Sequence, residues 1–182
     1  MRRSGPRKPR PPLDEDKLNE LMLAYVGRFA TSRARLAAYL SRKLRQRGWA
    51  GPGQPPVEAL VAKAARVGFV DDAAFALSKS RSLTARGYGE RRVGQALHAA
   101  GIADGDGEAA RGHARDDAVD SALRFAHKRR IGPFAAAGAD PAGREKALAA
   151  MVRAGHGFRL AKAVLALAPG AAIDRQALED ER

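Results

Sequence analysis

Residues 31–49 read TSRARLAAYLSRKLRQRGW, and this stretch predicts an amphipathic helix with a strongly basic exposed face. Leucine and tyrosine side chains recur at helical spacing at positions 36, 39, 40 and 44, which places them in one stripe toward the core. Thr31 or Ser32 can cap the N-terminus of this helix, and Gly48 can end it. The segment from Arg33 to Arg47 carries six basic side chains and no acidic one. The stretch therefore indicates a helical fold and raises the question of what the basic face contacts.

The composition of the whole chain also favours helices over sheets. Its 182 residues include 40 alanines and 17 leucines, but only 14 valines, isoleucines and threonines together. Cysteine is absent, which excludes disulfides and thiolate metal sites. No apolar run approaches the ~18 residues of a membrane-spanning helix, and the basic N-terminus leads into no apolar segment of the kind found in secretory signals. We therefore expect a cytoplasmic protein with no membrane partner.

Helical periodicity, interrupted by glycine and proline, divides the chain into about nine expected helices. A loose linker is expected at residues 131–142, which contain Pro133 and Pro141. The expected helices lie between Pro12 and Val26, between Ser32 and Gly48, from Val57 to Gly68, from Asp71 to about Arg86, at 90–100, within 106–113, from Asp116 onward, at about 143–154 and at about 158–167.

An internal repeat groups these helices in threes. Gly48, Gly101 and Gly155 are spaced 53 and 54 residues apart, and each ends a helix that carries arginine. Repeats of this length are typical of helical solenoids, in which each unit contacts only its neighbours. We therefore predict an all-α protein of three tandem three-helix, helix-turn-helix-like repeats, elongated and curved. Its expected parts are a disordered basic, proline-rich tail at 1–12, three-helix units at 13–70, 71–115 and 116–168, and a polar, fraying tail at 169–182.

The net charge of +13, from 33 basic and 20 acidic residues, favours a polyanionic neighbour such as nucleic acid, an acidic protein or a membrane surface. On a helical projection, Arg35, Arg42 and Arg45 fall within an arc of about 80° on the exposed side of the first basic helix. Arginine pairs bidentately with phosphate or carboxylate. No acidic residue of the same helix neutralises this row, although acids of the second unit could do so. An ordinary solvated helix face is the alternative interpretation.

Further basic clusters occur in each expected unit and together suggest an extended positive track. Residues 128–130 lie at a helix C-terminus, where the helix dipole alone would favour cations. Aromatic residues make up only 5% of the chain, so stacking can contribute little to nucleic-acid binding. The predicted binding set is Arg33, Arg35, Arg42, Lys43, Arg45, Arg81, Arg86, Arg91, Arg92, Lys128, Arg129, Arg130, Arg153, Arg159 and Lys162.

No residue pattern indicates catalysis, a metal or a cofactor. The four histidines show no H-x-x-x-H or H-E-x-x-H spacing, and no G-x-x-x-x-G-K-[ST] sequence is present. Acidic pairs at 15–16, 71–72 and 116–117 stand at expected helix starts, where capping is the expected role. Trp49 directly follows Gly48, so we expect a hydrophobic contact after the helix end, with base stacking as the alternative.

Three segments resemble the RecX family of bacterial regulators. Residues 32–49, within the opening stretch, are similar to the family pattern S-R-x-E-L-x-x-x-L-x-x-[KR]-G. Residues 68–81, GFVDDAAFALSKSR, resemble the family motif G-[LY]-[IL]-[DN]-D-x-x-[FY]-A-x-x-x-x-x-R, and residues 86–102 are similar to the helix that follows it. The resemblance covers about residues 15–167 and is most specific in the middle of the chain.

The resemblance implies an all-helical regulator that binds the recombinase RecA, chiefly as its filament on single-stranded DNA, and inhibits its ATPase and strand exchange in recombination and repair. Contact with single-stranded DNA is implied as well, and double-stranded DNA is a further candidate. A monomer that needs no cofactor is expected. The residues carried over are Arg33, Arg35, Arg42, Asp72, Phe75 and Arg81, of which Asp72 and Phe75 are expected to be structural. Arg35 stands where the family often has glutamate, which shifts the expected partner toward nucleic acid.

Two other functions remain open from the residues alone. A general DNA- or RNA-binding helical protein without a recombinase partner would bind nucleic acid and leave RecA unaffected. A helical adaptor for another acidic partner would bind neither DNA nor RecA. An enzyme is the weakest hypothesis, because no catalytic constellation is present.

Overall fold

The computed structural model describes residues 11–137 and 140–182, and its regular structure in these ranges is helical. Ten α-helices and one short 3-10 helix are formed there, together with an isolated β-bridge between Leu13 and Trp49. The all-α prediction is therefore confirmed. The predicted basic tail lies outside the described residues except for Pro11 and Pro12. None of the helices in the described ranges has the length and apolar character needed to cross a membrane.

The chain divides into two compact units, one ending at Asp72 and one beginning at Ala73. Three hydrophobic clusters fill them: one in the first unit, and two in the second. Each cluster draws mainly on three successive helices. The predicted division into three repeats, and the predicted curved shape, stay predictions.

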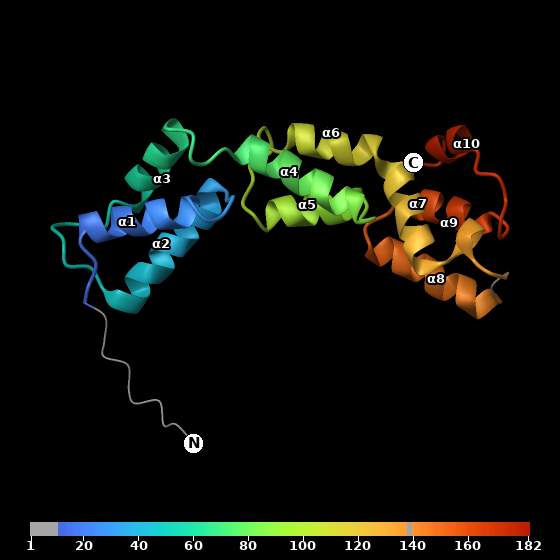
Figure 1. Cartoon of the computed structure of the whole chain (residues 1–182), viewed down its shortest axis with the longest axis horizontal. Helices are drawn as coiled ribbons and strands as arrows, with labels where there is room; N and C mark the ends of the chain where they lie inside the picture. Colours follow the sequence, from blue (N-terminus) through green and yellow to red (C-terminus); the bar gives the residue numbers. More distant parts are fainter. Residues whose placement is uncertain (1–10, 138–139) are drawn as a thin grey trace, which may run out of the picture. The chain divides into compact units, whose positions relative to one another are not determined.

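The first unit consists of α1 (Glu15–Val26), α2 (Arg33–Arg47) and α3 (Val57–Arg66), with α2 packed against both other helices (Figure 1). Leu36 and Leu40 of α2 are fully buried in its core, as the apolar stripe predicted. The Ser32 hydroxyl caps α2 by accepting the Arg35 N–H at 3.2 Å. Trp49 packs against the same core, and its ring N–H donates to the Gly53 carbonyl at 3.1 Å, so its role here is structural.

A buried carboxylate completes the N-terminus of α2. The Asp72 side chain is 4% exposed, and it accepts the Arg33 backbone N–H at 2.8 Å and the Arg33 Nε at 3.1 Å. The first N–H groups of a helix lack partners within the helix, so a carboxylate at this place satisfies one of them and also favours the helix dipole. An acidic side chain thus caps a helix far away in sequence, which the local pattern does not reveal.

The second unit holds α4 (Asp72–Ala85), whose first residue is the last residue of the first unit, followed by six further α-helices and one 3-10 helix. One cluster joins α4, α5 and α6, and the buried Ser80 hydroxyl donates to the Ala110 carbonyl at 2.7 Å across it. The other cluster joins α7, α8, α9 and α10, and Tyr88 packs against both. The further helices are α5 (Glu90–His98), α6 (Glu108–Asp116), α7 (Ala118–Arg129), η1 (Gly132–Phe134), α8 (Pro141–Arg153), α9 (Phe158–Ala166) and α10 (Arg175–Glu179).

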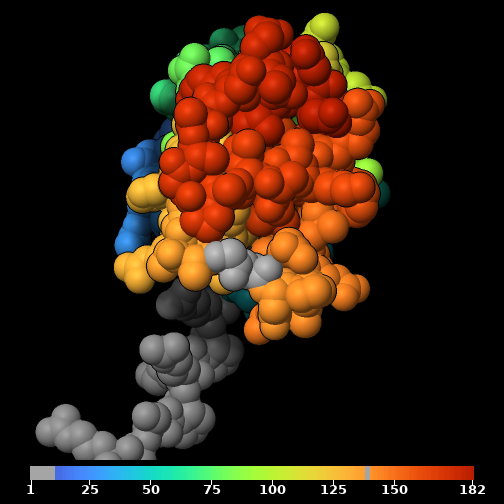
Figure 2. All heavy atoms as spheres, turned by 90° about the vertical axis from the view of Figure 1, so that its right-hand side faces the viewer, coloured from blue at the N-terminus to red at the C-terminus, as the bar shows by residue number. Residues whose placement is uncertain are grey.

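The C-terminal segment differs from the expectation of a fraying tail. Residues 175–179 form α10, which packs on α7 and α9, and Leu178 is only 3% exposed. The Asp174 carboxylate caps this helix by accepting the Ala177 N–H at 3.2 Å. Figure 2 shows the dark red C-terminal residues lying directly on the orange-red residues of α9. Leu178, together with Ile173, which also packs on this cluster, and the Arg175–Asp120 ion pair, anchors the segment.

The structure also differs from the sequence expectation in the loose linker at 131–142 and at the start of α7. Gly132–Phe134 form η1 with Pro133 buried, and α8 begins at Pro141 with the Asp140 carboxylate as its cap. Asp116 ends α6 rather than opening α7. Asp117 stands at the N-cap position of α7 without a side-chain capping bond, because its carboxylate pairs with Arg124 instead. The capping prediction for this acidic pair is therefore wrong.

Two glycines permit a close backbone approach in the second unit. A Cβ built on Gly89 would lie 2.4 Å from the Gly155 carbonyl oxygen, and one built on Gly155 would lie 2.5 Å from the Arg92 backbone nitrogen. The approach allows Gly89 N–H to donate to the Ala154 carbonyl at 3.0 Å, and Arg91 N–H to donate to the Gly155 carbonyl at 3.1 Å. The N-terminus of α5 is thereby fastened to the turn between α8 and α9.

We predict that Gly89→Ala destabilises the protein by ~2–4 kcal/mol, because the added methyl must push the two backbones apart and break these hydrogen bonds. Gly94→Ala, inside α5, is the matched control, because a Cβ there meets no atom within 4 Å. This control should stabilise by ~0.5–1 kcal/mol through the better helix propensity of alanine. Denaturant unfolding measures both, and equal free energies of unfolding for the two variants would contradict the proposed clash.

Candidate functional site

The exposed face of α2 carries basic side chains that the described part of the chain does not neutralise. Arg42 and Arg45 are exposed and Lys43 is half-buried, and none of the three forms an ion pair with a described carboxylate. We call these three residues the α2 surface. Arg33 belongs to the same helix but is paired with Asp72, so its charge is partly satisfied within the protein.

Aromatic rings support the α2 surface. Tyr39 is half-buried and stacks on Tyr25 of α1, with ring centroids 4.1 Å apart and ring planes 17° apart. The Arg42 guanidinium lies 5.7 Å and the Lys43 ammonium 5.4 Å from the centre of the Tyr39 ring. The negative face of an aromatic ring attracts a cation at such distances. The helical projection placed Tyr39 in the buried stripe and did not anticipate that its ring would hold two cations in place.

A concave basic site lies in the second unit, and we call it the unit 2 groove. It has a volume of about 600 Å³. Its apolar base consists of Tyr88, Phe125, Ala150 and Ala154, which are half-buried or buried, and its rim consists of exposed cations. These cations come from the segment after α4, the last turn of α7 and one face of α8: Arg86, Lys128, Arg129, Lys146 and Arg153.

The five rim cations have no acidic neighbour in the groove. No carboxylate lines it, and none of the five forms an ion pair with a carboxylate of the described residues. Like charges around a concave surface raise its positive potential, and low-dielectric walls concentrate that field. Arg86 and Arg129 are held by rings, with their guanidinium carbons 5.3 Å from the Tyr88 centre and 5.5 Å from the Phe125 centre. The site is therefore suited to bind a polyanion.

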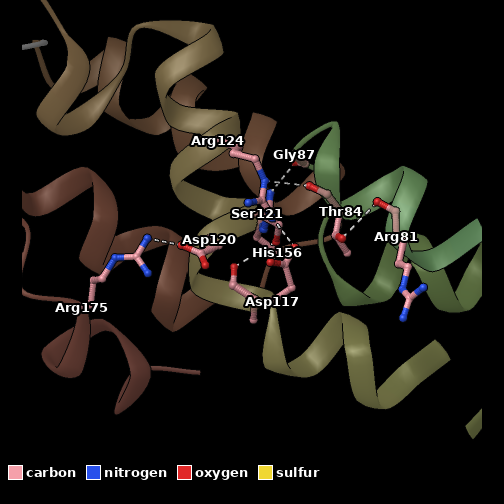
Figure 3. Close-up of polar contacts among 10 residues, drawn as sticks. Arg81, Thr84, Gly87, Asp117, Asp120, Ser121, Arg124, His156 and Arg175 are labelled. Atoms are coloured by element: carbon pink, nitrogen blue, oxygen red, sulfur yellow. Dashed lines mark hydrogen bonds and ion pairs between the residues drawn. The ribbon is translucent and has the colours of Figure 1, made fainter. Parts of the chain in front are cut away.

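Neighbouring arginines in the second unit are neutralised, which sets the groove apart. Figure 3 shows Arg124 paired with Asp117 and Arg175 paired with Asp120. Arg124 Nε also donates to the Thr84 carbonyl at 3.1 Å. These arginines join α4, α7 and α10, so their role is structural.

The structure brings four predicted binding residues of the second unit, Arg86, Lys128, Arg129 and Arg153, together in the groove. Three predicted residues of the first unit form the α2 surface. Lys146 was missed, although it stands seven residues before Arg153 and thus on the same face of α8. Among the others of the second unit, Arg159 is paired with Glu181 at 3.1 Å. The remaining predicted residues of this unit, Arg81, Arg91, Arg92, Arg130 and Lys162, are exposed and do not line the groove.

A buried histidine lies beneath the groove. His156 is 2% exposed, its Nε2 lies 3.0 Å from the Gly87 carbonyl oxygen, and its ring meets Phe125 edge-on. A carbonyl only accepts, so Nε2 carries the proton, while Nδ1 has no hydrogen-bond partner among the described residues. Burial lowers the pKa of His156 below its usual 6.5, and the hydrogen bond to Gly87 opposes this only in part.

We predict that acid weakens the fold through His156. Because the folded pKa is depressed, the unfolded chain binds the proton more readily, and stability falls as the pH drops below about 6.5 toward the folded pKa. His156→Gln, which keeps a donor for the Gly87 carbonyl but does not titrate, should flatten this dependence. His98→Gln, at an exposed position, is the control. Chemical denaturation between pH 5 and pH 8 measures the slopes, and an unchanged slope in the His156 variant would contradict the assignment.

No group of three or more potential metal ligands occurs among the described residues.

No protein-family model matches the chain. The chain is 33% identical over 176 residues to the "Regulatory protein RecX" of Myxococcus xanthus (strain DK1622), and the match covers 88% of this chain and 90% of that relative. The structure of the present chain is similar to the crystal structure of RecX from Lactobacillus salivarius, with a TM-score of 0.63; the match covers 82% of this chain and 92% of that chain. The sequence identity in the latter comparison is 16%, so it bears on the fold alone.

Proposed function

The chain belongs to the RecX family of regulatory proteins, and from that premise we propose that it binds the RecA filament on single-stranded DNA and inhibits its ATPase and strand exchange. It acts by binding, as a monomer, without catalysis or a cofactor of its own. The observation that carries this proposal is the α2 surface, where Arg42, Lys43 and Arg45 have no ion-pair partner among the described residues.

The α2 surface supports filament binding through charge. A recombinase filament on DNA presents phosphates, and Arg42 and Arg45 can each pair with a phosphate by two parallel hydrogen bonds. The aromatic stack beneath Tyr39 keeps Arg42 and Lys43 from sampling many conformations, which reduces the entropy lost on binding. Binding of this kind speeds encounter and weakens steeply with salt.

A second candidate function is nucleic-acid binding without a recombinase partner. The unit 2 groove supports it, because its rim cations converge without any acidic residue. The two functions differ in one measurable respect: a general nucleic-acid-binding protein would bind DNA or RNA and leave the RecA ATPase unchanged when DNA is in excess.

We predict that the wild-type protein inhibits RecA ATPase on single-stranded DNA and that the double variant Arg42→Glu/Arg45→Glu requires about tenfold more protein for half-inhibition. Removal of two charge-assisted hydrogen-bonded pairs, each worth on the order of 1.5–3 kcal/mol, accounts for at least that change. The matched control is Lys63→Glu/Arg66→Glu, which makes the same charge change on exposed residues of α3 in the same unit.

Each result of this titration has a definite meaning. If the wild-type protein leaves ATP hydrolysis unchanged, the regulatory function is wrong. If the double variant inhibits as well as the wild type, the α2 surface is the wrong surface. Equal losses in the double variant and the α3 control would indicate that only net charge matters.

A further inference from the structure

We infer that the unit 2 groove is a separate nucleotide-binding site that takes one unpaired base together with its adjacent phosphates. The ligand is either a nucleotide of a single strand or a free nucleoside polyphosphate, which share this chemistry. The site does not need RecA and is distinct from the α2 surface that carries the main proposed function. The inference rests on the second candidate function, nucleic-acid binding by this groove, and specifies its ligand.

The rim supplies the phosphate contacts. Lys146 and Arg153 lie on one face of α8, and Lys128 and Arg129 lie in the last turn of α7, so two helices present cations to one concave surface. Arg86 joins them from the segment after α4. Five positive charges without a described carboxylate partner repel each other in the free protein, and bound phosphates relieve that repulsion. Solubility alone does not require five cations to converge on one concave surface.

The base of the groove supplies the contact for a nucleobase. Tyr88, Phe125, Ala150 and Ala154 form an apolar patch inside the ring of cations. The volume of about 600 Å³ lies within the range of small-molecule sites, roughly 300–1,000 Å³. Bases of a duplex are paired and stacked on one another, whereas an unpaired base can leave its stack and lie on an aromatic side chain or a guanidinium plane. The combination favours single-stranded or free nucleotides over duplex.

The groove is held in shape before any ligand binds. Tyr88 lies between Gly87, whose carbonyl contacts His156 at 3.0 Å, and Gly89, whose N–H donates to the Ala154 carbonyl at 3.0 Å. Both sides of the Tyr88 segment are therefore tied to the end of α8 and the turn after it. A site built on fixed elements loses little conformational freedom on binding.

Fluorescence anisotropy of the full chain, without RecA, tests the inference with two labelled probes: oligodeoxythymidine and a nucleoside triphosphate. Lys146→Gln/Arg153→Gln should weaken binding about tenfold or more. For the oligonucleotide it should also lower the salt slope by ~1.4, because each neutralised phosphate of a single strand contributes ~0.7 to that slope. Tyr88→Leu, which keeps an apolar side chain in both clusters, should weaken binding by about tenfold because a leucine cannot stack on a base. The matched control, Arg144→Gln/Lys162→Gln, removes the same charge from exposed residues outside the groove and should change little.

The outcomes distinguish the two ligand sources, a single strand and a free nucleotide. They also distinguish this inference from the proposed regulation of RecA. Groove-dependent binding of the oligonucleotide alone assigns the ligand to a strand, and groove-dependent binding of the triphosphate assigns it to a free nucleotide. If both probes bind the folded groove variants as tightly as the wild type, the inference is overturned. It is also overturned if double-stranded DNA binds as tightly as the single strand and is weakened equally by the groove substitutions. Loss of RecA inhibition in the α2 variant with intact nucleotide binding leaves this inference standing, because the two tests use different residues.

Discussion

The close approach of Gly89 and Gly155 is the constraint on which the arrangement of the second unit depends. Any side chain at either position would collide with backbone atoms of the other segment. The approach fastens the start of α5 to the turn after α8 and fixes Tyr88 between two anchored glycines. Tyr88 then packs against both clusters of this unit and contributes to the base of the groove. A local backbone contact thereby helps to determine where the unit 2 groove forms.

Electrostatics divides the arginines of this protein into two groups. Arg33, Arg124 and Arg175 reach the carboxylates of Asp72, Asp117 and Asp120. The pairs of Arg33 and Arg175 join segments that are distant in sequence, whereas the Arg124–Asp117 pair lies within the first turns of α7. The α2 surface and the groove rim have no such partners among the described residues. A partly buried ion pair stabilises a particular arrangement of helices, whereas a set of uncompensated cations costs stability unless an anion binds. The net charge of the chain alone does not show which arginines belong to which group.

The two basic surfaces differ in shape and therefore in what they fit. The α2 surface lies along one helix and is supported by a stack of tyrosines, a form that is compatible with the extended partner that we propose for it. The unit 2 groove is concave, with cations around an apolar base, and suits a compact ligand. Both lie on helices whose apolar faces are buried in a hydrophobic cluster, which gives the charged side chains a rigid support.

The sequence by itself determined the helical class, most helix boundaries, the buried stripe at Leu36 and Leu40 and the family, because periodicity, capping and motif spacing are local properties. It did not indicate α10 or the distant cap of α2 by Asp72, since a single buried leucine or carboxylate has no periodic signal. Nor did it separate Arg153 in the groove from Arg159 in an ion pair. Only the tertiary structure decided these, because a side chain's partners depend on which helices fold against each other.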